Sequence, residues 1–298
     1  MLPDCVGEKD LRILLATPLY SAHHWDSGHF WLKAFNSLGN YVRIWDYRLE
    51  LDTPVGQWDF TLIMKGESVD PETLPHPRFC YWPDALDRTP SIETLLAKYD
   101  KVFTPVRPTP ADMEWLPSGF DPDIHHYNGA KKDIPSLYIG TNNGQRKIDF
   151  LKKIRPSIIA GNNWGGVAEQ INDGYTQPIR LLLPQYLHDF VALASRAQVL
   201  INIHQGPQVP VGVNRKLFEC CACGLTISDR VPGVVEILGP DLAQLVTFDT
   251  PQEGRELLEY WSDRTQEERD EIWGKEKKAI EPFTYVEGVK RILNALPL

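Results

Sequence analysis

The chain has 298 residues, of which 42% are hydrophobic and 24% charged, a composition typical of a globular protein with room for two domains. Its formal net charge is −9, from 40 acidic and 31 basic residues. Because non-specific nucleic-acid binding depends on Lys and Arg neutralising phosphates, this balance argues against a general DNA- or RNA-coating protein.

The sequence contains no apolar run of about 18 residues, so no membrane span is expected. Its start, "MLPDCVGEKDLRILLATPLY", places acidic residues before a short apolar run and lacks the layout of a signal peptide. The five cysteines are an odd number in a chain without such a signal, which indicates free thiols in a reducing compartment. We therefore expect a cytoplasmic protein.

Short apolar runs alternate with amphipathic stretches in the first part of the chain. Residues 11–17 ("LRILLAT") are typical of a buried parallel strand, and residues 29–40 ("HFWLKAFNSLGN") predict a helix that ends at Gly39 and Asn40. Further strands are predicted at "YVRIWDY", "FTLIMK", "RFCYW" and "KVFTP". Alternating elements of this size indicate a parallel sheet with crossover helices.

A polar stretch rich in glycine and proline, residues 118–135, has the composition of an interdomain connection. The alternation then restarts, with strands at "SLYIG", "SIIAG", "QVLINIHQ" and "LTISD" and helices at "RKIDFLKKI", "PQYLHDFVALASRA" and "RKLFECCACG". The expected fold class is α/β, with two Rossmann-like doubly wound domains facing a cleft. Their expected boundaries are 1–133 and 134–298, and the last helix can pack back on the first domain.

The stretch "VGVNRKLFECCACGLTISD" (211–229) is compatible with a metal site, a redox site or the wall of a binding cleft. Cys220, Cys221 and Cys223 lie within one predicted helical turn, with no second pair elsewhere. Structural zinc needs pairs separated by a loop, and a thioredoxin-like site needs Cys-x-x-Cys at the start of a helix. We predict that these thiols pack in the core and bind no metal.

Arg215 and Glu219 are four residues apart on this predicted helix, so an ordinary i,i+4 ion pair is one interpretation. The helix also follows a strand and a loop, so its start points toward the expected cleft. There Arg215 and the free backbone N–H groups suit a diphosphate, and a glutamate one turn later can accept both hydroxyls of a ribose.

Arg146 repeats this pattern in "YIGTNNGQR", after a strand and a glycine-containing loop, although a plain turn with a solvated arginine would look the same. Together the two helix starts favour a nucleotide-sugar site. The chain lacks Gly-x-Gly-x-x-Gly and a Walker-type lysine, so it offers no ordinary NAD or NTPase alternative.

The second half resembles GT-B glycosyltransferases, specifically the CgeB-like (spore-maturation type) group. The matching segments are "LYIGTNNGQR", "IIAGNNWG", "LINIHQ", "NRKLFECCACGLTISDRVPGVVEIL" and "FTYVEGVKRIL", with "YWPD" and "LPSGFDPDIHH" in the first half. The resemblance implies a donor site in the C-terminal domain and an acceptor site in the N-terminal one. It implies that Glu219 binds the ribose of the donor and that Arg146 and Arg215 lie near the diphosphate. It also implies that residues 161–164 and 184–186 line the binding site of the nucleotide base. The expected donor-site residues are Gly140, Arg146, Asn163, Trp164, Tyr186, His204, Asn214, Arg215, Phe218 and Glu219.

The chain departs from the broader retaining family at Val211, which replaces the first glutamate of the Glu-x7-Glu signature. CgeB-like members often lack this glutamate too. The fold expected from the resemblance is unaffected, and both retention and inversion at the sugar stay compatible with the sequence.

The candidate catalytic residues follow predicted strands of the first domain: Asp84, Asp26 and His24, beside His23. A carboxylate there can act as a base or orient the acceptor, or it can be a helix cap. His204, at the end of a strand, can contact donor phosphate or sugar, or be a buried structural histidine. Tryptophans at positions 25, 31 and 82 can stack on a sugar, although tryptophan is commoner in a core.

The sequence therefore predicts a hexosyltransferase-type glycosyltransferase that takes a nucleotide-sugar, a UDP-sugar, as co-substrate and needs no cofactor and no metal ion. The alternatives are a sugar-nucleotide epimerase or hydrolase of the same fold, and a non-catalytic protein that binds a sugar nucleotide. A glycan, a protein, a small metabolite and a modified nucleic-acid base are all compatible acceptors, because acceptor loops carry no readable code.

Overall fold

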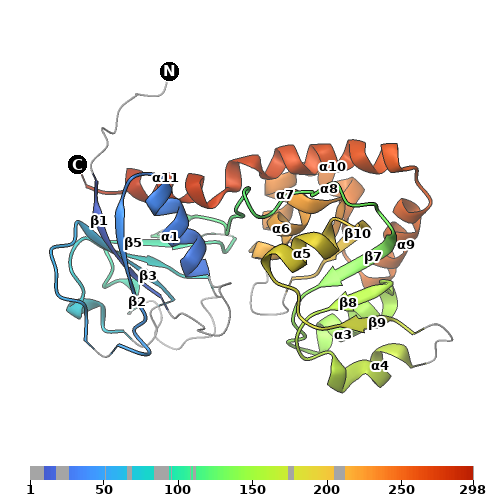
Figure 1. Ribbon diagram of the computed structural model, residues 1–298, viewed down its shortest axis with the longest axis horizontal. Helices are drawn as coiled ribbons and strands as arrows, with labels where there is room; N and C mark the ends of the chain where they lie inside the picture. Colours follow the sequence, from blue (N-terminus) through green and yellow to red (C-terminus); the bar gives the residue numbers. More distant parts are fainter. Residues whose placement is uncertain are drawn as a thin grey trace. The chain divides into compact units, whose positions relative to one another are not determined.

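The computed structural model describes residues 10–17, 27–50, 52–65, 69–83, 94, 96–107, 109, 112–173, 178–204 and 212–297. They form two compact units. The first comprises the described residues up to Pro117 together with those from Tyr285 onward, and the second comprises Ser118–Thr284. Each unit is an α/β domain built on a six-stranded parallel sheet, which confirms the predicted fold class (Figure 1).

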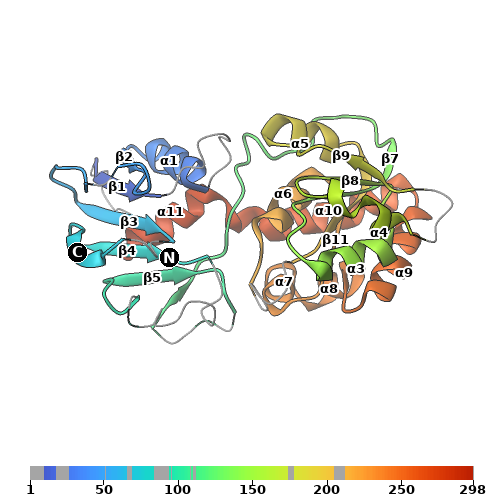
Figure 2. The same ribbon diagram turned by 90° about the horizontal axis from the view of Figure 1, so that it is seen from below.

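The sheet of the first unit has the strand order β2-β1-β3-β4-β5-β6, with every neighbouring pair parallel. Its strands are β1 (Arg12–Ala16), β2 (Tyr41–Trp45), β3 (Phe60–Met64), β4 (Arg78–Tyr81), β5 (Lys101–Thr104) and β6 (Glu114–Trp115). Figure 2 shows β3, β4 and β5 side by side. Every residue of β3 is buried, as expected of a parallel strand that is covered on both faces.

Two helices of the first unit, α1 (Ser27–Ser37) and α11 (Tyr285–Asn294), pack against each other although they come from opposite ends of the chain. The ring of Tyr285 lies 5.0 Å from that of Phe30 and 5.4 Å from that of Trp31, between centroids. Trp31 and Trp82 are 1% and 0% exposed. Both are therefore core residues, the commoner of the two alternatives for a tryptophan.

The sheet of the second unit has the order β12-β11-β10-β7-β8-β9 and is also parallel throughout. Its strands are β7 (Ile134–Ile139), β8 (Ile158–Ala160), β9 (Arg180–Leu182), β10 (Ala197–Asn202), β11 (Thr226–Asp229) and β12 (Thr247–Phe248). The chain runs outward in one direction from β7 and in the other from β10. The pair β7 and β10 is therefore the topological switch point of this sheet.

Helices surround this second sheet. They are α3 (Gln145–Ile154), α4 (Ala168–Asn172), α5 (Leu187–Ala194), α6 (Arg215–Cys223), α7 (Pro232–Leu238), α8 (Pro240–Val246), α9 (Pro251–Ser262) and α10 (Gln266–Ile280). Helix α3 packs against α9, while α6 packs against α5 and α10. No helix in the described part of the chain combines the length and apolar character that a membrane span requires.

The cysteines of α6 belong to the core of this unit. Cys220 and Cys223 lie in an apolar cluster with residues such as Leu137 and Phe190, and Cys221 is 0% exposed. Burial raises the pKa of Cys220 to about 12, so its thiol stays protonated at neutral pH. The prediction that these thiols pack in the core is confirmed.

The polar segment that precedes β7 is part of the second unit. The backbone N–H of Asn128 donates to Ser195 Oγ at 3.3 Å, and Arg196 Nε pairs with Asp133 Oδ1 at 2.8 Å. These contacts tie the segment to the end of α5 and the turn after it.

Candidate functional site

The carboxyl ends of β7 and β10 are where an open parallel sheet of this order binds its ligands, because the connections after them diverge. Gly140 follows β7, in the loop that leads to α3, and His204 follows β10, two residues after Asn202. Arg146 and Arg215 then stand in the first turns of α3 and α6. The structure therefore brings both predicted arginine-bearing helix starts to the switch point.

The start of α3 has no side-chain cap. Its N-cap residue is Gly144, with φ of 151°, a left-handed backbone that favours glycine. The N-terminal N–H groups of a helix lack intrahelical partners and carry the positive end of the helix dipole. A glycine cap leaves these donors accessible to an anion, as in phosphate-binding loops.

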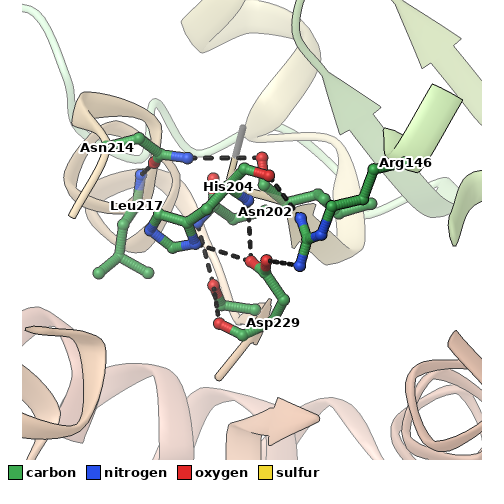
Figure 3. A network of polar contacts seen from close by, with 8 residues as sticks. Arg146, Asn202, His204, Asn214, Leu217 and Asp229 are labelled. Atoms are coloured by element: carbon green, nitrogen blue, oxygen red, sulfur yellow. Dashed lines mark hydrogen bonds and ion pairs between the residues drawn. The ribbon is translucent and has the colours of Figure 1, made fainter. Parts of the chain in front are cut away.

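Arg146 reaches from α3 to the ends of β10 and β11 (Figure 3). Its Nη1 donates to the carbonyl oxygen of His204 at 2.6 Å, and its Nη2 pairs with Asp229 Oδ2 at 2.8 Å. The guanidinium also lies 4.4 Å from the ring centroid of Phe150. Its side chain is 36% exposed, so the guanidinium is held in place without being buried.

His204 and Asp229 form a buried pair, 1% and 2% exposed. Asp229 Oδ1 accepts from the backbone N–H of His204 at 2.8 Å and lies 2.7 Å from its Nδ1. Burial alone would raise the pKa of Asp229, but the charge and hydrogen bonds of His204 and the hydrogen bond from Arg146 lower it to about 2. Asp229 is therefore a carboxylate, and the proton between the two side chains sits on Nδ1.

The start of α6 lies beside the same strand end. Asn214 caps this helix, accepting from the backbone N–H of Leu217 at 3.0 Å, and its Nδ2 makes a long contact of 3.5 Å with the carbonyl oxygen of Ile203. Arg146 binds the next carbonyl along the chain, that of His204. The starts of α3 and α6 thus both reach the two residues that follow β10 (Figure 3).

Glu219 is buried at 2% exposure and paired with its own helix. Arg215 Nε lies 2.8 Å from Oε1, and Lys216 Nζ lies 2.6 Å from Oε2. Burial alone would raise the pKa of Glu219, but Arg215, Lys216 and His125 lower it to about 2. The i,i+4 pair foreseen in the sequence is formed, and its carboxylate lies in the interior rather than on an exposed helix face.

His125 completes this cluster from the segment before β7. Its Nδ1 lies 3.2 Å from both the backbone nitrogen and the carbonyl oxygen of Asp121, and its Nε2 lies 3.5 Å from Glu219 Oε1. Burial, opposed by Glu219, lowers the pKa of His125, so the ring is neutral at neutral pH. Sequence reasoning missed His125 because the segment was interpreted as a connection.

The loop after β8 meets the loop after β7 closely. Gly161 has φ of 150°, and a Cβ at this position would overlap the carbonyl of Gly140. The indole N–H of Trp164 donates to that carbonyl at 2.7 Å, and Trp164 is only 2% exposed. Trp164 therefore supports the loop from beneath and presents no open ring face.

Other predicted donor-site residues lie around this loop. Asn163 is exposed with φ of 64°, and its carbonyl accepts from Asn142 Nδ2 at 3.1 Å. Tyr186 is half-buried at the N-cap of α5, and its hydroxyl accepts from Asn162 at 3.1 Å. Exposed amides and a phenol at one sheet end can recognise the polar edge of a base.

Two groups of predicted residues stand apart from this site. Phe218 is 0% exposed, and its ring lies 5.7 Å from that of Phe283, so it packs in the core. The catalytic candidates His24, Asp26 and Asp84 lie outside the described residues. The same is true of His23, Trp25 and Val211.

Two charged residues of the site were not foreseen. Asp229 ends β11, and a carboxylate at the carboxyl end of a buried parallel strand is a signal that sequence inspection could have used. Lys216 lies three residues before Glu219, a spacing that places the two on one helix face. Asp229 adds a negative charge beside Arg146 of α3, and Lys216 adds a positive charge beside Glu219 of α6.

Two Rossmann-like units, with cationic helix starts at the switch point of the second, define a GT-B type of glycosyltransferase fold. Residues 146–294 match the family described as "Glycosyl transferase-like", and the chain belongs to this family. No curated protein matches the chain significantly.

Solved structures with the same fold include other glycosyltransferases. AviGT4, a glycosyltransferase involved in avilamycin A biosynthesis, is 14% identical, with 95% of this chain and 96% of that chain covered and a TM-score of 0.66. An alpha-glucosyltransferase in complex with UDP and a 13-mer DNA is 13% identical, with 95% and 99% covered and a TM-score of 0.62. T4 phage BGT in complex with its UDP-glucose substrate is 11% identical, with 97% and 100% covered and a TM-score of 0.63. At these identities the likeness concerns the fold.

Proposed function

We propose that this protein transfers a sugar from a UDP-sugar to the hydroxyl of an acceptor, without a metal ion at the donor site. One observation carries the proposal: the starts of α3 and α6 both reach the two residues that follow β10, at the switch point of the second sheet. That arrangement brings the backbone N–H groups of α3 and the Arg146 guanidinium to one strand end, with Arg215 in the first turn of the neighbouring helix α6, which suits a diphosphate.

In this proposal the diphosphate is held by the uncapped N–H groups of α3, by Arg146 and by Arg215. Breaking the bond between the sugar and the diphosphate leaves additional negative charge on the phosphate oxygens. Fixed cations and helix dipoles stabilise that charge as it develops, which is the task that a bound cation performs elsewhere. This is why we expect turnover without added metal.

Ribose recognition is assigned to Glu219, as the CgeB-like resemblance implies. Its carboxylate already accepts from Arg215 and Lys216, so ribose hydroxyls would have to share these oxygens or replace one of the two cations. Asn163 and Tyr186 are assigned to the base. Hexosyl transfer to an acceptor held by the N-terminal unit, with Asp84, Asp26 or His24 as the base, completes the proposal.

The first experiment is a thermal-shift titration of the purified protein with UDP, ADP, GDP and their sugar conjugates. A ligand that binds only the native state raises its stability, by about 2.7 kcal/mol at one hundred times Kd. UDP and at least one UDP-sugar are expected to raise Tm in a concentration-dependent way. If neither UDP nor any UDP-sugar shifts Tm, the UDP-sugar donor of this proposal is contradicted.

The second experiment follows the stabilising UDP-sugar over time with and without candidate acceptors, in EDTA and in added magnesium. A transferase releases UDP quickly only when an acceptor is present. Acceptors to test include glycans, peptides, small hydroxylated metabolites and DNA that carries a hydroxylated base, because two solved relatives of this fold were crystallised with DNA. Fast UDP release or sugar epimerisation without any acceptor would instead indicate the hydrolase or epimerase alternative.

A further inference from the structure

A cavity of about 450 Å³ lies in the second unit, on the side of the sheet where β7 begins. Its walls are the 127–132 segment, which leads into β7, and one face of α10, with Gln266, Asp270 and Trp273. This side is opposite the carboxyl strand ends that carry the candidate donor site. Small-molecule sites occupy about 300–1,000 Å³, so the cavity has the size of a binding pocket.

Two aromatic side chains form the apolar part of this cavity. The rings of Tyr127 and Trp273 lie 5.5 Å apart between centroids and are nearly perpendicular, at 78°. The Trp273 indole N–H donates to the carbonyl oxygen of Cys221 at 2.7 Å, and the Tyr127 hydroxyl donates to that of Ala130 at 2.7 Å. Because both polar ends are bound, the orientation of the two rings is fixed before any ligand arrives.

Lys132 contributes a cation without a matching anion. Its Nζ lies 4.8 Å from the Tyr127 ring centroid and 5.5 Å from that of Trp273, and it donates to the carbonyl oxygen of Cys223 at 3.3 Å. That carbonyl ends α6 and carries only a partial negative charge. No carboxylate pairs with Lys132 in the part of the chain that the structure describes. Because a half-buried charge is normally paired, an anionic group is the expected ligand of this ammonium.

The charged groups around Lys132 keep it close to neutrality. Burial lowers its pKa to about 8, and Arg269 also lowers it, whereas Cys223 and Asp270 raise it. Lys131 is exposed, as is Asp270, whose Oδ1 accepts from Gln266 Nε2 at 2.7 Å. A ligand with hydroxyl groups can donate to the exposed Asp270 carboxylate, whereas a purely aromatic anion would only be repelled by it.

We propose that this cavity binds a sugar phosphate. The phosphate pairs with Lys132, the apolar face of the sugar ring packs on Tyr127 and Trp273, and sugar hydroxyls bind Asp270 and Gln266. No covalent bond is made or broken. The cavity adjoins the last turn of α6, whereas Arg215 lies in the first turn, so this site is additional to the donor site and does not depend on the proposed function.

The test is calorimetric titration of the full chain with glucose, galactose and mannose 6-phosphates and with glucose 1-phosphate, at about pH 7 with UDP present in excess. At least one sugar phosphate is expected to bind at a single site. Its free sugar, inorganic phosphate and benzoate should each bind at least roughly 10-fold more weakly, since each lacks part of the match. In Lys132→Gln the affinity for the sugar phosphate should fall roughly 10- to 100-fold.

Two further variants serve as controls. Lys275→Gln removes an exposed lysine of the same helix, paired with Glu271, and should bind the sugar phosphate as the wild type does. Lys132→Arg keeps the positive charge at every pH and should retain most of the affinity. Wild-type affinity should fall roughly 10-fold or more between about pH 7 and about pH 9.5, because the lysine loses its proton while the phosphate, with a second pKa of about 6, stays doubly ionised. In Lys132→Arg this fall should be absent.

The pH series on the wild-type protein decides the proposal even if Lys132→Gln does not fold. Three results would overturn it: no sugar phosphate binds, binding persists in folded Lys132→Gln or is unchanged at high pH, or inorganic phosphate or benzoate binds as tightly as the best sugar phosphate. Because the titrations do not require UDP to bind, the proposed function stands or fails separately.

Discussion

Two buried carboxylates of the second unit, Glu219 and Asp229, look alike until their partners are compared. Each is 2% exposed, and in each case cationic neighbours lower the pKa to about 2. Glu219 is surrounded by three nitrogen donors of the chain itself, from Arg215, Lys216 and His125. Asp229 binds Arg146 and His204, and the histidine ends in a nitrogen with no partner among the described residues.

The two carboxylates therefore differ in whether their surroundings leave a polar atom for a ligand to bind. A buried charge whose partners all come from the chain stabilises the fold, and removing one partner is costly because the other charge is left uncompensated. A buried pair that ends in an unpaired atom holds that atom in position at a cost in stability, which a ligand can offset. We therefore expect changes at Glu219 and changes around Asp229 to lower both stability and affinity, with the larger loss of affinity around Asp229.

The largest effect on affinity is expected from Arg146→Ala. It removes a cation from the proposed diphosphate site and one of the partners of Asp229. Charge-assisted hydrogen bonds are each worth about 1.5–3 kcal/mol, so UDP affinity should fall roughly 100-fold, at 1.4 kcal/mol per factor of ten. Calorimetric titration with UDP measures it.

The matched control for this variant is Arg196→Ala, an arginine of the same unit whose ion pair with Asp133 is largely exposed. Its UDP affinity should stay at the wild-type value. If a folded Arg146→Ala protein binds UDP as tightly as the wild type, the proposed position of the diphosphate at the start of α3 is wrong.

Glu219→Gln keeps the shape of the side chain and removes its charge. If Glu219 accepts the ribose hydroxyls, UDP affinity should fall by roughly 10- to 100-fold. Because Arg215 and Lys216 lose a buried partner, the free energy of unfolding should fall as well, by about 1–3 kcal/mol. Denaturant unfolding and calorimetric titration of the same sample measure the two quantities separately.

The control here is Glu259→Gln, which removes the exposed i,i+4 partner of Arg255 on α9. Exposed helical pairs are worth about 0.3–0.5 kcal/mol, so its stability should barely change. A Glu219→Gln protein that loses stability but binds UDP normally would leave Glu219 with the structural role alone.

Acid should unfold the second unit through the same two carboxylates. The pKa of Glu219 is lowered from 4.5 to about 2, and that of Asp229 from 3.8 to about 2. A depressed folded-state pKa contributes stability that is fully present above the unfolded-state value and lost as pH falls through the folded-state one. The free energy of unfolding should therefore decline between about pH 4.5 and pH 2, and less steeply in Glu219→Gln. A wild-type stability that is flat over this range would contradict the ionised state of both groups.

What the sequence could predict was local. The apolar run of β3, the helix start at Arg215 and the i,i+4 spacing to Glu219 follow from periods of two and 3.6 residues, which need no knowledge of the rest of the fold. The burial of the three cysteines of α6 follows from the same reasoning, because one helical turn offers no geometry for structural zinc.

What the sequence could not predict depends on strand order. Arg146 meets Asp229 across 83 residues of chain because β7 lies beside β10, and no local pattern specifies that neighbourhood. His125 reaches Glu219 from a segment whose composition indicates only a loop. Trp164 was expected to line the base, but the close approach of Gly161 to Gly140 directs its indole inward.

The smallest effect is expected from removing metal ions or from probing the thiols. These two experiments test whether the second unit is stabilised by its own charges or by a bound ion. Cys220, Cys221 and Cys223 are at most 1% exposed, and burial raises the pKa of each. Only the thiolate reacts quickly or binds zinc. EDTA should therefore leave Tm and UDP affinity unchanged.

In a Cys5→Ser variant, the remaining thiols are Cys80 and the three of α6, all of which are buried. A thiol reagent should modify them only as fast as the protein unfolds, and completely in denaturant. The same reagent applied with and without UDP sharpens the test, because a ligand seated at the start of α6 should slow the modification of Cys220, one residue beyond Glu219, by stabilising the native state. Stoichiometric zinc in the purified protein, or rapid labelling of these thiols under native conditions, would contradict a core held by packing and ion pairs alone.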